Sequence, residues 1–116
     1  MANTNKIPTQ EVFARRLRDC RKRAGLSQMR LGVLAGIDER SASPRINQYE
    51  RGKHFPDMGT ITRLALALEV PPAYFFAEDE HLAAWILFWH DLADTEKQEW
   101  LARTGAQPKL QPQSHD

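Results

Sequence analysis

The stretch "SQMRLGVLAGIDERSASPRINQYERGK" (residues 27–53) decides the fold of this 116-residue chain. Ser27 is a good N-cap for a short helix, and Gly36 is a residue type that ends helices. Ser43-Pro44 is a second start signal, because serine caps a helix and proline suits its first turn. Gly52 ends this second helix. The stretch therefore predicts two short helices, over residues 28–35 and 44–50, joined by a turn.

The two predicted helices carry residues that would let them pack closely. Gly32 permits a close approach of the helices, and Ile37 follows the turn as an apolar plug. Ile46 and Tyr49 are three positions apart, so they point to the same side of the second helix. Two helices arranged in this way can bind DNA, because the second fits the major groove and its first side chains reach the base edges.

The rest of the chain also has a helical pattern. Phe13, Leu17 and Cys20 recur every three or four residues in a first helix, where Cys20 acts as a small hydrophobic residue. Asp57 can cap a later helix. No run alternates apolar and polar residues as a half-buried strand would, so we expect an all-α protein. A first helix is expected from its cap Thr9 to about residue 24, and another after Asp57 through Leu68. A short helix is expected within residues 70–76, another over residues 81–93, and a last one that Asp94 or Thr95 caps and that stops near Gly105.

The formal net charge of +1 conceals two oppositely charged halves. Residues 13–53 contain eleven Lys or Arg and four Asp or Glu, whereas residues 57–103 contain three Lys or Arg and nine Asp or Glu. The first half would attract a polyanion and the second would repel it. Two solvated helical surfaces of opposite sign explain the same counts, so charge alone does not decide between these interpretations.

Several segments make the chain resemble a known family. They are "FARRLRDCRKRAGLSQ" (13–28), "LGVLAGI" (31–37), "INQYERGKHFPD" (46–57) and "ITRLALALEVPPAYFF" (61–76). Over about residues 13–76 the chain resembles the Cro/repressor-type helix-turn-helix transcriptional regulators, also called the xenobiotic-response-element (XRE) family. The resemblance implies a five-helix, lambda-repressor-like DNA-binding domain, which we place at residues 9–77.

The resemblance also implies roles for individual residues. Side chains at the start and middle of the second short helix would read bases, and these are Ser43, Pro44, Arg45 and Gln48. Contacts to DNA phosphates would come from Gln28 and Lys53, and we add Asn47 and Arg51 to these phosphate contacts. The resemblance further suggests that Glu50 pairs with Arg21, which would tie the first helix of the chain to the base-reading helix.

One segment departs from the usual family spacing. The interval from Ile37 to Ile46 is longer than is usual in the family by about one helical turn. Arg40 lies in this longer segment and could touch a phosphate or a base from an enlarged turn. Alternatively, the segment forms a helical turn of its own after Asp38. Both interpretations remain open.

Residues 78–105 predict a C-terminal helical extension, and residues 106–116 predict a disordered tail. The extension carries an apolar stripe with helical spacing. This stripe could pack back onto the rest of the chain or form a two-fold dimer interface, and one wide stripe could serve both purposes. We expect a dimer, because such regulators bind palindromic half-sites one DNA turn apart. The interface residues would be Leu82, Trp85, Ile86, Trp89 and Leu92.

These features favour binding over catalysis. No Gly-rich phosphate loop, activated nucleophile or metal-ligand cluster is evident, so we expect no enzyme, metal or cofactor, and no small-molecule substrate. We expect a repressor that binds double-stranded DNA as a homodimer. The alternative is an antitoxin-like or adaptor protein whose main partner binds the aromatic C-terminal helix. No signal peptide or membrane-length apolar run is visible, which favours a cytoplasmic protein.

Overall fold

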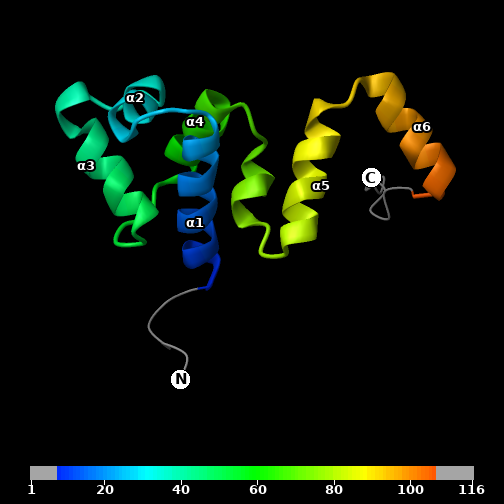
Figure 1. Ribbon diagram of the computed structural model, residues 1–116, viewed down its shortest axis with the longest axis horizontal. Helices are drawn as coiled ribbons and strands as arrows, with labels where there is room; N and C mark the ends of the chain where they lie inside the picture. The colour runs from blue at the N-terminus through cyan, green and yellow to red at the C-terminus, as the bar shows by residue number, and fades with distance from the viewer. Residues whose placement is uncertain (1–7, 107–116) are drawn as a thin grey trace, which may run out of the picture.

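The structure is a computed structural model that describes residues 8–106, and all regular structure in that range is helical. The predicted all-α class is confirmed. No helix of the described residues is both long and apolar enough to cross a membrane. The elements, shown in Figure 1, are α1 (Pro8–Arg23), α2 (Gln28–Leu34), α3 (Glu39–Glu50), α4 (Met58–Leu68), the 3-10 helix η1 (Pro72–Phe76), α5 (Glu80–Asp91) and α6 (Asp94–Thr104).

Side-chain caps define the starts of α2 and α4, as the sequence predicts. The Ser27 hydroxyl accepts a hydrogen bond from the backbone N–H of Arg30 at 3.0 Å. The Asp57 carboxylate accepts one from the backbone N–H of Thr60 at 2.7 Å. This second bond favours the charged form of Asp57 and lowers the pKa of its carboxyl. Both caps satisfy backbone groups that a helix terminus would otherwise leave without a partner.

The core lies where α1, α2, α3, α4 and η1 meet. Phe13 of α1 is fully buried, and its ring packs against Phe55, Phe75 and Phe76 with centroid distances of 5.2, 5.1 and 5.9 Å. Cys20 is buried on the same side of α1, and burial raises the pKa of its thiol. A raised pKa keeps the thiol protonated, so Cys20 is a packing residue rather than a nucleophile.

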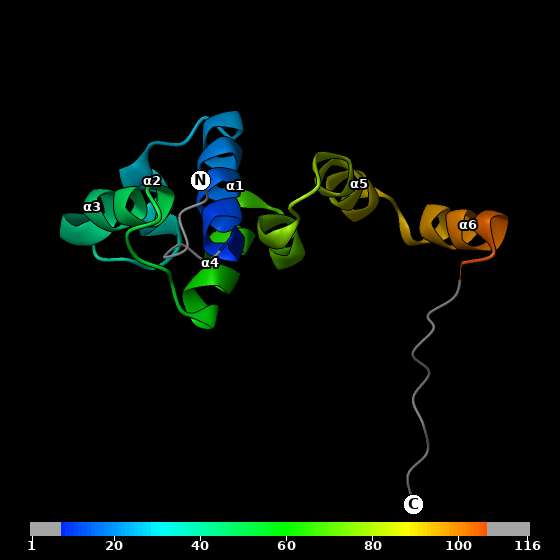
Figure 2. The ribbon, with the colours of Figure 1, turned by 90° about the horizontal axis from the view of Figure 1, so that it is seen from below.

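The C-terminal helices differ in how they contact the rest of the chain. α5 packs on the core through the buried Ala83 and the partly buried Ile86 and Leu87. In α6 no residue is buried, and Figure 2 shows this helix at the end of the molecule farthest from α2 and α3. Packing back onto the rest of the chain, one of the two uses considered for the apolar stripe, thus describes α5, whereas α6 has no buried residue. The expected disordered tail lies outside the described residues, apart from Ala106.

Candidate nucleic-acid interface

The interface begins with the crossing of α2 and α3, which depends on two small residues. A Cβ atom built on Gly32 would lie 2.6 Å from the Cβ and 2.9 Å from the Cα of Ala42. Only glycine therefore permits the two helices to lie this close. The chain then turns at Gly36, whose φ of 85° lies in the left-handed region that glycine adopts most readily. Ile37 follows and packs against the core.

The start of α3 differs from the sequence prediction. A helix beginning at Pro44 with Ser43 as its N-cap is wrong, because α3 begins at Glu39 and Pro44 lies inside it. The segment after Asp38 forms a helical turn, one of the two alternatives left open, and this turn is continuous with the rest of α3. The physical reason is the fully buried Ala42, which packs against Gly32 and thereby holds the first turn of α3 against α2.

A sequence signal for the longer helix was present. Ala42, Ile46 and Tyr49 have the spacing i, i+4, i+7 and are all buried, so they form one continuous inward stripe. Pro44 lacks the backbone N–H that would bind the carbonyl of Arg40, and an interior proline is usually unfavourable. The tertiary contact at Ala42 outweighs this local preference, and the Ser-Pro start signal was therefore misleading.

Gln28 connects α2 to three residues of α3. Its side-chain N–H groups donate to Asn47 Oδ1 and to Glu50 Oε1, both at 3.2 Å. Its carbonyl oxygen accepts a hydrogen bond from the Ser43 hydroxyl at 3.4 Å. The structure thus brings together Gln28, Ser43 and Asn47, and all three are half-buried. These hydrogen bonds orient α3 on α2, which is a role that the sequence did not predict for these side chains.

Glu50 and Arg21 form an ion pair that joins the end of α3 to α1. Arg21 Nε donates to Glu50 Oε2 at 2.6 Å, and Nη2 donates to Glu50 Oε1 at 3.0 Å. The bonds to the carboxylate raise the pKa of Arg21 further above its already high value. The Glu50 side chain is only 3% exposed and that of Arg21 is 13% exposed, so both charges are largely removed from solvent. This carboxylate therefore does not face a DNA backbone.

The opposite face of α3 is exposed. Arg40, Pro44 and Gln48 follow one another at intervals of four residues, so they share one side of the helix, with Arg45 beside them. We call these four residues the reading face. Each of them is exposed to solvent. The extra turn of α3 thus places Arg40 on the helix itself, one turn ahead of Pro44, and not on an enlarged loop.

Two further predicted phosphate residues lie at the end of α3. Arg51 and Lys53 are exposed and flank Gly52, whose φ is 71°. The backbone N–H of Lys53 donates to the carbonyl of Gln48 at 3.0 Å, which holds the turn against the last turn of α3. Both cations therefore lie at the end of the helix that carries the reading face.

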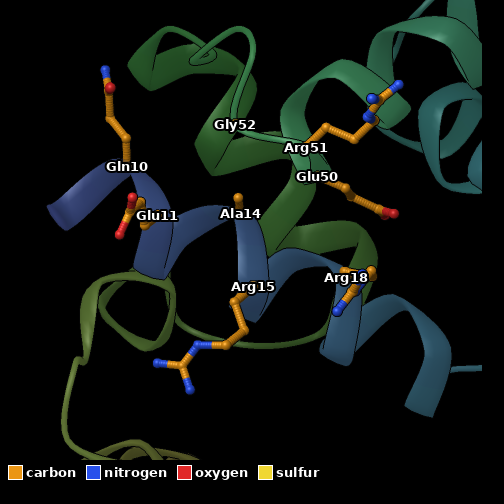
Figure 3. A pocket seen from close by; sticks show the side chains of 8 residues that line it. All are labelled: Gln10, Glu11, Ala14, Arg15, Arg18, Glu50, Arg51 and Gly52. Atoms are coloured by element: carbon orange, nitrogen blue, oxygen red, sulfur yellow. The ribbon is translucent and has the colours of Figure 1, made fainter. Parts of the chain in front are cut away.

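A cleft of about 280 Å³ lies between α1 and the end of α3. Its lining includes three arginines, Arg15, Arg18 and Arg51. Figure 3 shows their guanidinium groups pointing in different directions rather than toward a common point. Arg15 also makes an ion pair with Glu80. The arrangement suits diffuse attraction along a polyanion better than capture of one small anion.

Only part of the predicted apolar stripe on α5 is available to a partner. Leu82 and Trp85 are exposed, and Trp89 and Leu92 are half-buried, but Ile86 packs toward the core of its own chain. Next to Trp85 lie two aromatic residues that the sequence interpretation left out of the interface, one exposed and one half-buried. They are Phe88 and Trp100, whose rings contact each other and Trp85 at centroid distances of 5.1–6.1 Å.

No group of three or more His, Cys, Asp or Glu side chains that could hold a metal ion occurs among residues 8–106.

The sequence interpretation missed one important basic residue, Arg16. The sequence analysis counted it only as one of the positive charges of residues 13–53, yet the structure buries it. The missed signal was its position between Phe13 and Cys20 on the inward stripe of α1, where a long side chain is directed toward the core.

Comparisons with known proteins agree with this geometry. Residues 12–74 match the helix-turn-helix domain family. The crystal structure of the transcriptional regulator BswR is similar, with 44% sequence identity and a TM-score of 0.75, and the match covers 79% of this chain and 91% of that one. The restriction-modification controller protein C.AhdI from Aeromonas hydrophila is also similar, with 33% identity and a TM-score of 0.53 over 60% of this chain and 100% of that one. No curated protein matches the chain.

Proposed function

Because the chain belongs to the helix-turn-helix domain family and is a DNA-binding regulator of the Cro/repressor type, we propose that it binds a palindromic operator as a homodimer and represses transcription there. The reading face of α3 enters the major groove. The observation that carries this proposal is the two-sided character of α3. One side is held by buried Ala42, Ile46 and Tyr49, and the other presents four exposed residues to solvent. A rigid helix with a free polar face is what groove reading requires.

The residues of the reading face have different expected roles. Gln48 suits adenine, which a side-chain amide binds through two hydrogen bonds, and Arg45 suits guanine or a phosphate. Pro44 offers an apolar contact, and Ser43 reaches a base only if it leaves Gln28. Arg40, on the first turn of α3, is assigned to a phosphate.

The phosphate contacts position the protein without reading sequence. Arg51 and Lys53 are free to take this role, because both are exposed at the end of α3. Gln28 and Asn47 are also assigned to phosphates. Gln28, however, uses both of its side-chain N–H groups in hydrogen bonds inside the protein. A phosphate oxygen must therefore replace Asn47 or Glu50 as the acceptor for Gln28.

Two substitutions separate base reading from phosphate binding. We expect Gln48→Ala to cost about 1–3 kcal/mol on the preferred operator and to relax the preference at one base position. We expect Lys53→Ala to weaken binding to every sequence about equally and to lower the slope of log affinity against log salt by about one. Affinities for the operator and for random DNA, measured at two salt concentrations, check both. The role assignment fails if the two variants behave alike.

The second copy in the proposed dimer contacts the exposed apolar residues of α5 and α6. Leu82, Trp85 and Phe88 of α5 are exposed, and the half-buried Trp100 of α6 contacts Trp85 and Phe88, so the aromatic rings form one surface. Figure 2 shows α5 and α6 on the side of the molecule away from α3. Aromatic residues are enriched in the cores of protein interfaces. The same surface favours the second candidate function, an adaptor or antitoxin-like protein whose main partner is another protein.

A charged substitution distinguishes these functions. We expect Trp85→Glu to convert the dimer to a monomer and to weaken binding to a palindrome by about 10²-fold or more, since two linked half-site contacts become one. The matched control is Leu66→Glu on α4, which introduces the same charge at an exposed apolar residue away from α5. Sedimentation and operator affinity are the measurements. A wild-type chain that is monomeric and binds no DNA at low salt, yet copurifies with another protein, would favour the adaptor function.

A further inference from the structure

Arg16 is a buried cation on α1 that bonds to the segment leading into α5. Its side chain is 4% exposed. Nε and Nη2 donate to the carbonyl oxygen of Ala77 at 2.9 and 2.7 Å, and Nη2 also donates to that of Glu78 at 3.2 Å. Nη1 donates to Glu80 Oε2 at 2.9 Å. The guanidinium group thus binds three acceptors within four residues of chain.

These acceptors mark the start of α5. Glu80 is the first residue of that helix, and Ala77 follows the last residue of η1. Hydrogen bonds from Arg16, and then from Arg15, lower the pKa of the Glu80 carboxyl, so Glu80 is charged at neutral pH. Planar guanidinium groups hold several acceptors in fixed directions, which a lysine ammonium does not. Arg16 therefore fixes both the position and the entry angle of the first turn of α5.

A second attachment lies further along the same helix. Ala83, Ile86 and Leu87 pack α5 against the core one to two turns after Glu80. Two attachments on one helix determine its direction, whereas apolar packing alone leaves a helix more freedom to rotate or slide. In Figure 1 α5 lies beside η1, on the side of α1 away from α2 and α3. A change in the direction of α5 would thus be transmitted to the far end of the molecule.

We propose that Arg16 is a positioning residue that sets the distance between the two α3 helices of the dimer, and so selects the spacing of the operator half-sites. The inference rests on the proposed function, in which two copies associate through α5. Half-sites must lie about one DNA turn apart, and each added base pair moves a half-site by about 3.4 Å and rotates it around the duplex. A rigid α5 tolerates only one spacing. A loosely held α5 tolerates several.

The test compares operators that differ only in spacing. Palindromes with the optimal spacer, and with one base pair added or removed, are titrated with wild-type and variant chains. For the wild type we expect a spacing change to weaken binding about tenfold, within the range of a single wrong base pair. For Arg16→Ala we expect this penalty to fall to about twofold or less. The quantity compared is the ratio of the affinities for the optimal and the altered spacing. This ratio is informative because a loss of folded protein lowers binding to all operators equally and leaves it unchanged.

Arg15→Ala is the matched control. It removes the same charge from the neighbouring position of α1 and loses the exposed ion pair with Glu80. Because Arg15 also lines the cleft, Arg15→Ala lowers the affinity for every operator, but the wild-type penalty for a changed spacing should remain. If Arg16→Ala does not fold, as judged by circular dichroism, Arg16→Lys is used instead, because lysine keeps the charge and loses the multiple bonds. A folded Arg16 variant with the full wild-type penalty would overturn the inference. A wild-type chain that binds no palindrome would overturn the proposed function, and this inference with it.

Discussion

Glu50→Gln is expected to lower the free energy of unfolding by about 3–5 kcal/mol, because it removes one partner of a buried ion pair. The substitution keeps the size of the side chain and removes its charge. The positive charge of Arg21 then stays in a site where it is only 13% exposed. A glutamine amide would also place N–H groups against the N–H groups of Arg21 or Gln28, both of which donate to this carboxylate now.

The measurement is urea unfolding followed by circular dichroism. Glu39→Gln is the matched control, since it makes the same change in an exposed residue at the other end of α3 and should cost less than about 1 kcal/mol. A double-mutant cycle adds a second test. The double variant Arg21→Gln/Glu50→Gln should lose less free energy of unfolding than the sum of the losses of the two single variants. Each single variant leaves one buried charge without its partner, whereas the double variant removes both charges. Unchanged stability of Glu50→Gln with altered DNA affinity would show that Glu50 acts at the DNA instead.

The second large effect is expected for Gly32→Ala. The added Cβ would approach Ala42 Cβ to 2.6 Å, closer than real Cβ contacts occur, so α3 must move away from α2. Overpacking of this kind typically costs about 1–3 kcal/mol. Since the neighbours are another Cβ and the backbone of α3 rather than the end of a flexible side chain, we expect the upper part of that range. A shifted α3 should also bind its operator more weakly.

Two variants make this prediction specific. Gly59→Ala on α4 meets only the ends of the Arg63 and Asp57 side chains, at 3.3 and 3.5 Å, and should be neutral or stabilising by up to about 1 kcal/mol. Ala42→Gly in the Gly32→Ala background removes the closest of the clashing atoms and should recover part of the lost stability. Thermal and urea unfolding of all three variants provide the measurement. Equal stabilities of Gly32→Ala and Gly59→Ala would contradict the close crossing of α2 and α3.

Much of the fold could be predicted from local signals. The caps at Ser27 and Asp57 and the glycine at position 36 act within a few residues of the chain, so the starts of α2 and α4 and the end of α2 are readable from sequence. The close crossing at Gly32 was also predictable. The caps and the turn depend on local backbone chemistry, whereas the crossing was indicated only by the small size of Gly32 and its partner Ala42 was not predicted.

Other features depend on contacts that are distant in sequence. The start of α3 was misassigned because the Ser43-Pro44 signal is local, whereas the packing of Ala42 on Gly32 is tertiary. The buried role of Arg16 could not be predicted, because its acceptors lie more than sixty residues away. For the C-terminal helices the apolar stripe was recognised, but its division between the core and an exposed aromatic surface follows from the rotation of α5, which no spacing rule determines.

In the candidate site, too, some features follow from local sequence signals and others depend on contacts between helices. The exposed positions of Arg45 and Gln48 follow from helix periodicity around Ile46 and Tyr49, and the structure places them as that periodicity requires. Lys53 is exposed in the turn after α3, which the breaker Gly52 predicted. The internal hydrogen bonds of Gln28 could not be predicted, because they require the orientation of two helices relative to each other. Arg40 joins the reading face only because α3 is one turn longer than the local signal indicates.

The central claim is that the exposed face of α3 reads a DNA major groove in a symmetric pair of molecules. The most direct test is selection of bound fragments from random-sequence DNA by the full chain. We expect enrichment of a palindrome whose half-sites have centres about 34–36 Å apart, and loss of that enrichment at one base position with Gln48→Ala. Fragments recovered with no shared sequence, or a motif that Gln48→Ala and Arg45→Ala leave unchanged, would contradict it.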